Sequence, residues 1–448
     1  MVQTKLKSKT HPKTVGFFLY MHSAYETREA LLESKPDMFV LLLLAGLIFS
    51  IPTNLFKTFL VETAYVRGLQ VDYLIPKFHL SDIFLITLFF ALVFRVENRE
   101  FLTKKIKALQ YKPALGALGI LFILFQITSA HPIVSLLFLL RIFILTITGV
   151  IVANNTHLLK SQITITAVKV TLIFQSLLAW YQYLTQGSLF NYYFFGETNL
   201  NAYAGVAQSS LLGIQKILPY GTTAHPNILA GVLTIFTLFL YNNLSKNSKI
   251  KHTEILILML SVSAILLTQS ISALLGLLFG FAFIYINKKN KISLTLKKVS
   301  QLFLFLNIFI VFFLFALSSQ NMRSSTSIYR RNFLNTASLT MLQSAPITGK
   351  GLQNFTAYLE ENSTNREVVR FIQPVHNILL LLLSETGFIG IVLITLVLLP
   401  IVKKESKIQH PEYLLAVLPI MVLDHYLLTI QSGLLIFFIT IIVSNKLN

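Results

Sequence analysis

The sequence predicts an all-α fold, a polytopic bundle of about twelve transmembrane helices with one large helical extracytoplasmic loop. The 448-residue chain is 54% hydrophobic and only 12% charged, which is not the balance of a water-soluble domain of this length. Apolar runs that could cross a hydrocarbon core of roughly 30 Å, about 20 residues each as helix, recur along the whole chain. The predicted spans lie near Phe39–Phe56, Leu80–Phe94, Pro113–Thr128, Pro132–Val152, Gln162–Tyr183, Pro226–Tyr241, Glu254–Thr268, Ser272–Ile286, Leu302–Leu317, His376–Val402, Tyr413–Leu428 and Leu434–Val443.

Polar segments divide the chain into four parts. Residues 1–37 read as a cytoplasmic tail, because they are too polar for a cleavable signal peptide. Transmembrane helices 1 to 9 occupy 38–317, an extracytoplasmic catalytic loop occupies 318–375, and transmembrane helices 10 to 12 occupy 376–448.

The positive charge is unevenly distributed. Of the 37 Lys and Arg, most fall on segments that face the cytoplasm if both termini lie inside, as expected for a multi-pass protein of the bacterial cytoplasmic membrane. The net charge of +19 otherwise fits attraction to anionic membrane lipids, and we assign it no nucleic-acid partner. One long loop breaks the charge rule, which indicates a negatively charged ligand there. Its cations are Arg323, Arg330, Arg331, Lys350, Arg366 and Arg370.

Two predicted helices begin with a histidine and an asparagine on the outer side. His225-Pro226-Asn227 opens one, and His376-Asn377 opens the other. Helix N-termini carry unpaired donors and partial positive charge, so they suit phosphate and keep a nearby imidazole neutral. We therefore expect His376 to act as a general base, with His225 as a second candidate. The alternative is that either histidine only hydrogen-bonds a loop carbonyl.

The long loop has the features of a clamp for a phosphorylated ligand. The pattern predicts a helix over Thr326–Ala345, lying on the membrane surface, then Gly349-Lys350-Gly351 and a short helical stretch near Phe355. Arginine forks match phosphate oxygens, and glycine permits close backbone approach. Arg330 and Arg331 point about 100° apart on a helix, so we expect only one of them to face the ligand.

Two cations lie inside predicted spans. Arg141 and Lys169 need partners there, and their own spans offer no carboxylate. The counter-ion is either a lipid-linked diphosphate or an acid from another span, such as Asp424 or Glu385.

Two further outer loops have alternative interpretations. Asp82, which follows the loop 57–79, is expected to cap the second span rather than to catalyse. The aromatic residues of the loop 185–223 form either an interfacial belt or a stacking surface for sugars.

The acidic residues favour a mechanism without a metal or other cofactor. The four aspartates include no DxD pair, and no HExxH pattern is present. We expect arginine to neutralise a diphosphate leaving group while histidine deprotonates an acceptor hydroxyl. The absence of cysteine excludes disulfides and thiol catalysis.

Several motifs, in this order and on this side of the membrane, resemble the O-antigen ligase and O-antigen polymerase superfamily of bacterial GT-C-like glycosyltransferases. The resemblance spans roughly residue 221 to the C-terminus. Its elements are His225-Pro226-Asn227, Arg331, Pro346-Ile347-x-Gly349-x-Gly351-x-x-x-Phe355, His376-Asn377 and Glu385-x-Gly387-x-x-Gly390.

The resemblance implies that Arg331 binds the diphosphate of an undecaprenyl carrier, with Arg330 as the alternate, and that His376 activates the acceptor. Many members carry a Ser-Arg pair where this chain has Ser270-Ile271, so either Arg141 or Lys169 substitutes or the chemistry differs. The remaining expected substrate contacts come from His225, Asn227, Asn377, Gly349, Lys350 and Gly351.

The sequence thus predicts metal-independent, inverting transfer of a glycan from undecaprenyl diphosphate to a hydroxyl of a lipid, protein or glycan acceptor. The alternative is a flippase, or another transporter or binding protein for the same lipid-linked polysaccharide. Transport would require cations along a continuous path, whereas transfer requires a neutral histidine beside an outward pocket.

Overall fold

The structure is a computed structural model, and it describes the chain in several stretches. They are residues 37–59, 64–107, 116–117, 119–120, 123, 127, 129–190, 192–202, 205–210, 214–245, 251–290, 292–318, 326–362, 372–403 and 408–446. The predicted tail, apart from Asp37, and most of the predicted span Pro113–Thr128 lie outside these residues. So do Arg323, Arg366 and Arg370.

The other eleven predicted spans each coincide with an apolar helix. Five helices are long and apolar enough to cross a membrane, and six more are apolar but shorter. The predicted all-α membrane fold is therefore confirmed, while the count of twelve spans stays a prediction. The helices are α2 (Met38–Ser50), α3 (Leu80–Val93), α6 (Pro132–Asn154), α8 (Gln162–Thr185), α9 (Pro226–Ser245), α10 (His252–Leu267), α11 (Ile271–Asn290), α12 (Leu296–Ser318), α14 (Ile378–Lys403), α15 (Pro411–Leu423) and α17 (Gln431–Lys446).

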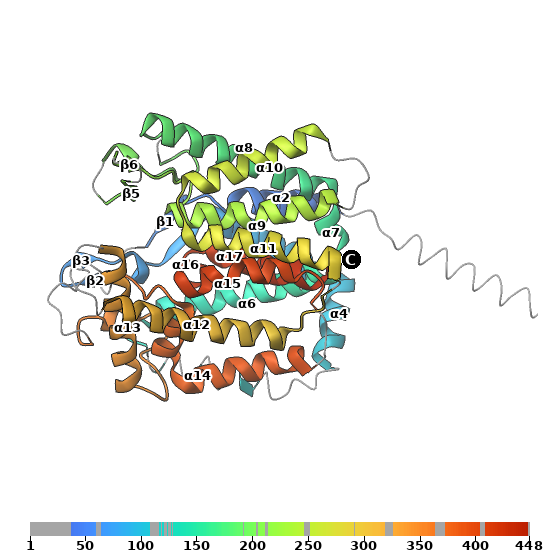
Figure 1. The fold of residues 1–448 in the computed structure, drawn as a ribbon. Helices are drawn as coiled ribbons and strands as arrows, with labels where there is room; N and C mark the ends of the chain where they lie inside the picture. Colours follow the sequence, from blue (N-terminus) through green and yellow to red (C-terminus); the bar gives the residue numbers. More distant parts are fainter. Residues whose placement is uncertain are drawn as a thin grey trace, which may run out of the picture.

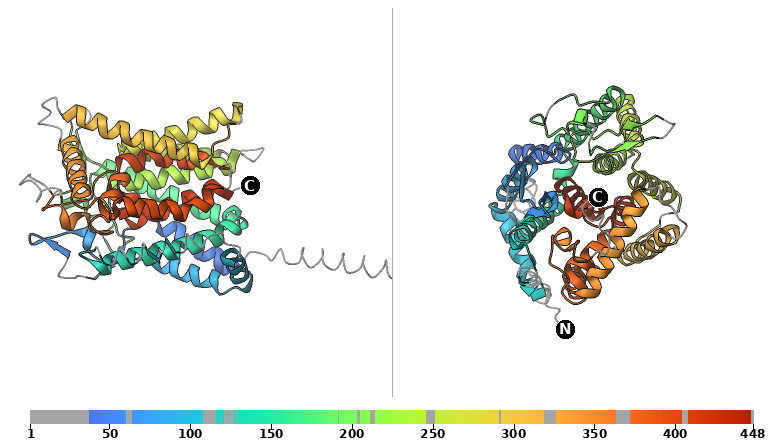
Figure 2. Two further views of the ribbon diagram at one scale, coloured as in Figure 1. Left: turned by 90° about the horizontal axis from the view of Figure 1, so that it is seen from below. Right: turned by 90° about the vertical axis from the view of Figure 1, so that its left-hand side faces the viewer.

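The long helices run side by side, and the two ends of the bundle differ (Figure 1). One end, which we call the loop end, carries the short strands and the crosswise helix α13 (Thr326–Ser344). The opposite end carries α4 (Val96–Lys107), α7 (His157–Lys160) and the C-terminus, and we call it the terminal end. Viewed from the loop end, the helices are seen end-on, with the red C-terminal helices among the others (Figure 2).

Three antiparallel strand pairs shape the loop end. The first pairs β1 (Phe56–Thr58) with β4 (Lys77–His79), which places Phe56 opposite His79 at the start of α3. The others pair β2 (Tyr65–Val66) with β3 (Leu69–Gln70), and β5 (Gln208–Ser209) with β6 (Lys216–Ile217). Short helical turns lie between them or near them: η2 (Asp72–Leu74), η3 (Leu200–Ala202), η5 (Phe355–Tyr358) and α16 (Tyr426–Thr429).

Helix α9 lies in the core of the bundle. Leu229, Leu233 and Leu240 on it are fully buried, and it packs against α8, α10, α11, α15 and α17. Small residues bring the helices close together, as is common in membrane bundles. At Gly276 of α11, an added Cβ would lie 2.2 Å from the carbonyl oxygen of Ala416 on α15, so only glycine fits there.

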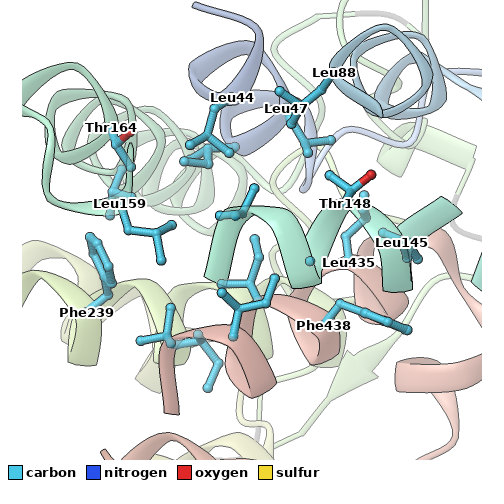
Figure 3. A pocket seen from close by; sticks show the side chains of 18 of the residues that line it. Leu44, Leu47, Leu88, Leu145, Thr148, Leu159, Thr164, Phe239, Leu435 and Phe438 are labelled. Carbon is cyan, nitrogen blue, oxygen red and sulfur yellow. The ribbon is translucent and has the colours of Figure 1, made fainter. Parts of the chain in front are cut away.

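An apolar cavity of about 60 Å³ lies within the bundle between α2, α3, α6, α8, α9 and α17. Leu44, Leu47, Leu88 and Leu435 are among the side chains that line it, with Thr148 as one of its few polar members (Figure 3). A space of this kind is lined mostly by hydrocarbon and offers a polar substrate few partners.

Helix α13 lies across the bundle end and packs on protein (Figure 2). Its observed bounds agree with the predicted helix to within one residue. The buried stripe Leu334, Ala337 and Met341 contacts Phe355 and Leu381 in a small core of its own. The side that was expected to lie on the membrane surface is therefore an internal face, which fixes α13 against α14.

Helix α14 is broken at Gly387, whose φ of 60° and ψ of −170° are not helical. An added Cβ at Gly387 would lie 2.4 Å from the carbonyl oxygen of Ile347. The loop after α13 docks on this break: Lys350 N–H donates to Ser384 O at 3.0 Å, and Gly351 N–H donates to Glu385 O at 2.8 Å. The glycines of both segments thus serve a close backbone-to-backbone contact.

Candidate functional site

A polar cavity of about 450 Å³ lies at the loop end. Segments far apart in the sequence form its walls: residues 72–79, the first half of α6, the start of α9, α13, residues 372–376, and the break between α15 and α17. Its chemically active lining residues are His79, Arg141, His225, Asn227, Arg330, His376, Asp424 and His425.

A chain of side chains holds His376 in the cavity. The Nδ1 atom of His376 lies 3.2 Å from Oδ1 of Asp424, and Asn227 donates from Nδ2 to Oδ2 of Asp424 at 2.8 Å. Asp424 is 4% exposed, so both carboxylate oxygens are used inside the protein. A carboxylate at Nδ1 places the ring proton on that nitrogen and leaves Nε2 as the acceptor. The arrangement suits a general base.

A second histidine packs on the first. The rings of His425 and His376 have centroids 4.8 Å apart and meet edge to face, and Nδ1 of His425 lies 2.6 Å from Oγ1 of Thr429. Sequence reasoning missed His425 and considered Asp424 only as a counter-ion. An acid followed directly by a histidine inside an apolar run is a costly pair, and that signal could have identified both residues.

His225 lies where it was expected, at the start of α9. It lines the cavity, and its Nδ1 accepts from the Asn227 N–H at 3.2 Å. Burial lowers the pKa of His225; the charge of Asp424 opposes this, and His376 and Arg330 reinforce it. His225 is therefore a neutral imidazole at pH 7. Its Nδ1 is occupied by the helix start, which gives it a capping role beside the site.

Of the two loop arginines, Arg330 lines the cavity, whereas Arg331 is not among the lining residues. Burial and the neighbouring charge of Arg331 lower the pKa of Arg330, but a guanidinium stays charged at neutral pH. The alternate, Arg330, is therefore the one that lines the cavity, and the role expected of Arg331 at the ligand stays a prediction.

Arg141 also reaches the cavity, and its partner is Asp82. Its Nη2 lies 2.9 Å from Oδ2 of Asp82 and donates to Lys77 O at 3.0 Å. The same carboxylate oxygen accepts from the His79 N–H at 2.8 Å, so the predicted capping role of Asp82 is confirmed. The counter-ion is neither Asp424 nor Glu385, because α3 packs directly beside α6.

Lys169 lies elsewhere, on the first half of α8 toward the terminal end. Its Nζ lies 2.6 Å from Oε1 of Glu254 on α10, and it does not line the cavity. The expected role of Lys169 in substrate binding is therefore corrected: it forms an ion pair between two neighbouring helices, and the proposed mechanism does not use it.

Four further predicted contacts serve the fold. Gly349, Lys350 and Gly351 dock on the break of α14 and do not line the cavity, so the predicted phosphate clamp is an internal joint. Lys350 places its Nζ 5.2 Å from the ring centre of Tyr358. Asn377 is 2% exposed; its Oδ1 accepts from the Leu380 N–H, and its Nδ2 donates to Val422 O. Asn377 thus caps α14.

Glu385 stabilises the contact between the loop 349–351 and the break of α14, which we call the joint. Its carboxylate accepts from the hydroxyl of Tyr73 at 2.6 Å and from the N–H groups of Gln353 and Phe355 at 3.0 Å each. Tyr73 and Gln353 both line the cavity. Glu385 is therefore a positioning residue for the cavity wall.

The aromatic loop borders the cavity through Tyr220, whose ring centroid lies 5.9 Å from that of His225. The hydroxyl of Tyr192 is tied to the backbone of Phe56, whereas Tyr193 is 84% exposed. Among the residues of this loop that the structure describes, no aromatic side chain lines the cavity. The interfacial and sugar-stacking interpretations of its exposed rings both stay predictions.

A histidine held by a carboxylate, a neighbouring guanidinium and a polar cavity at one end of an apolar bundle define a polytopic membrane protein with an enzyme-like site. Residues 256–395 match the family model described as O-antigen ligase. The match confirms the resemblance to the O-antigen ligase and polymerase superfamily. No curated protein matches the chain.

The matched segment includes Arg330, Arg331, the joint on α14 and His376. His225, Asn227, Asp424 and His425 lie outside it and reach the same cavity through the fold. The family thus supports a membrane enzyme of the O-antigen ligase type that transfers glycan.

Proposed function

We propose that this protein is a glycosyltransferase of the O-antigen ligase or polymerase type in the bacterial cytoplasmic membrane. It moves a glycan from undecaprenyl diphosphate to a hydroxyl of a lipid, protein or glycan acceptor on the outer face. The observation that carries the proposal is His376, held by Asp424 at the wall of the cavity that also contains Arg330. The family match over residues 256–395 supports a lipid-linked glycan as the class of substrate.

His376 acts as the base in the proposed reaction. Its Nε2 takes the proton of the acceptor hydroxyl, and the oxygen then forms a bond to the anomeric carbon. The bond from that carbon to the diphosphate oxygen breaks, so the configuration inverts. Asp424 stabilises the imidazolium that forms, and Asn227 holds Asp424 in place.

The departing diphosphate gathers negative charge, which Arg330 would stabilise. Arg330 lines the cavity, as do His225 and Asn227 at the start of α9. Arg331, the neighbouring residue on α13, supports the same positive potential. The chemistry is complete without a metal or cofactor.

Transport of the same lipid-linked glycan is the second candidate, and the distribution of cations favours transfer. A translocation path would expose cations along the bundle, but Lys169 pairs with Glu254 and Arg141 pairs with Asp82. Below the polar cavity, the cavity within the bundle is lined by hydrocarbon.

The test is an assay of the purified protein in nanodiscs with a lipid-linked oligosaccharide, with and without a chelator. We expect His376→Ala to lower turnover by about 100- to 10,000-fold, and Arg330→Ala to lower it more than Arg331→Ala. The control is His252→Ala, an exposed histidine at the terminal end. Unchanged turnover in His376→Ala would remove the base, and loss of turnover with the chelator would overturn the metal-free mechanism.

A further inference from the structure

One wall of the polar cavity carries charges that cancel one another. Nζ of Lys77 lies 2.9 Å from Oδ2 of Asp72, and Nη2 of Arg141 lies 2.9 Å from Oδ2 of Asp82. Because each cation already has a carboxylate, this wall offers a diphosphate little net attraction.

The same wall and the break between α15 and α17 hold polar atoms that have no hydrogen-bond partner within the described residues. The Oη of Tyr426, the Oε1 of Gln431 and the Nδ1 of His79 are such atoms, and their residues line the cavity. Tyr426 is 3% exposed, Gln431 is 4% and His79 is 8%. A fourth such atom is Nε2 of Gln373.

The geometry shows why these groups are unpaired. Gln431 uses its Nε2 to donate to Oδ1 of Asp82 at 2.7 Å, which leaves its Oε1 without a donor. The Nδ1 of His79 stands 3.6 Å from Oδ2 of Asp82, beyond hydrogen-bond reach. A buried polar group without a partner costs about 1–3 kcal/mol, so several around one cavity call for an explanation.

A ligand with hydroxyl groups supplies the missing partners. The unpaired groups are uncharged, and they include an acceptor (Gln431), a donor (Gln373) and a hydroxyl that does both (Tyr426). A phosphate only accepts, so it would not satisfy Gln431. A sugar hydroxyl donates and accepts, and it fits all three.

We propose that Tyr426, Gln431, His79 and Gln373 form a carbohydrate subsite, separate from the Arg330 side of the cavity. The proposal rests on the proposed function for the place of the sugar, which is next to His376. The sugar belongs either to the glycan of the carrier or to a glycan acceptor.

Tyr426→Phe tests the subsite, because it removes only a hydroxyl that has no hydrogen-bond partner in the described part of the chain. The probes are undecaprenyl diphosphate bearing a disaccharide, undecaprenyl diphosphate alone, and the free disaccharide, each titrated into wild type and variant in nanodiscs. We expect affinity for the disaccharide-bearing carrier to fall about three- to tenfold, with affinity for the bare carrier unchanged. Gln431→Met should act in the same direction.

The matched control is Tyr413→Phe, which makes the same change at a fully buried tyrosine near the terminal end. Its hydroxyl accepts from Nδ2 of Asn242 at 3.0 Å. We expect this control to lower the melting temperature and leave affinity for all three probes unchanged. Tyr426→Phe should leave the melting temperature unchanged and lower the affinity for the disaccharide-bearing carrier. A tyrosine with a purely structural role would not show this pattern.

The outcomes separate the possibilities. A fall for the free disaccharide in Tyr426→Phe assigns the subsite to an acceptor glycan, and a fall for the carrier-linked disaccharide alone assigns it to the donor. Equal affinities of wild type and Tyr426→Phe for the disaccharide-bearing carrier overturn the subsite, as does an equal fall for both carriers. Sugar-dependent binding without transfer would keep the subsite and reject the transferase.

Discussion

The loop end and the body of the bundle handle polar groups in opposite ways. In the body, Lys169 pairs with Glu254 and Asn242 pairs with Glu412, and the cavity there is lined by hydrocarbon (Figure 3). The unpaired polar atoms there, such as those of Thr148, Ser176 and Asn307, lie on different helices. At the loop end, helix starts and a helix break bring four residues with unpaired polar atoms to one cavity. The difference indicates that the body serves stability and the loop end serves a ligand.

The largest expected effect is a loss of turnover when Asp424, at the loop end, is replaced. In Asp424→Asn, the new amide would donate to Nδ1 of His376, so the ring proton moves to Nε2 and the base is lost. We expect turnover to fall about 100-fold or more with little change in melting temperature. The control is Asp37→Asn, which alters an ion pair with Arg95 far from the cavity. Full activity in Asp424→Asn would contradict a base role for His376.

The next effect tests whether the joint on α14 depends on a close backbone contact. Gly387→Ala places a Cβ 2.4 Å from Ile347 O at a positive φ, and we expect a loss of about 2 kcal/mol or more in unfolding free energy. Gly68→Ala is the matched control, because Gly68 also has a positive φ but nothing lies within 4 Å of the added Cβ. Equal thermal shifts in the two variants would show that the contact contributes nothing.

A smaller effect is expected in the body. Lys169→Met leaves Glu254 without its cation, and we expect a loss of about 1 kcal/mol in stability with turnover per folded molecule unchanged. The double variant Lys169→Met with Glu254→Gln should recover most of that loss. A selective fall in turnover would mean that Lys169 acts on the substrate, and the contrast between the two regions would break.

The smallest effect concerns one unpaired hydroxyl in the body. The hydroxyl of Thr148 is buried at the apolar cavity without a hydrogen-bond partner in the described structure. Thr148→Val removes this hydroxyl at nearly constant side-chain volume. We expect the free energy of unfolding to rise by about 1 kcal/mol and the melting temperature to rise by a few degrees. A fall in melting temperature would show that this hydroxyl has a structural role.

The sequence predicted the local features well. Hydropathy located eleven helices, turn signals bounded α13, and the two His-Asn helix starts were placed at one end, where both reach the same cavity. Each of these depends on neighbouring residues along the chain, so a local pattern is sufficient.

The pairings between helices could not be predicted. Which acid meets Arg141 depends on α3 packing beside α6, and no run of residues encodes that contact. The glycines at 349 and 351 were interpreted as a phosphate cradle, yet the same conformational freedom serves contact with another backbone strand. Residue type indicated the need for close approach, but it did not identify the partner.

The break in α14 has a consequence for engineering. Because the loop supplies N–H groups to carbonyls that the interrupted helix leaves open, residues 345–351 and 384–390 form one interdependent module. A chimaera that exchanges only the loop between relatives would expose those carbonyls, whereas an exchange of the whole module would transfer a self-consistent unit.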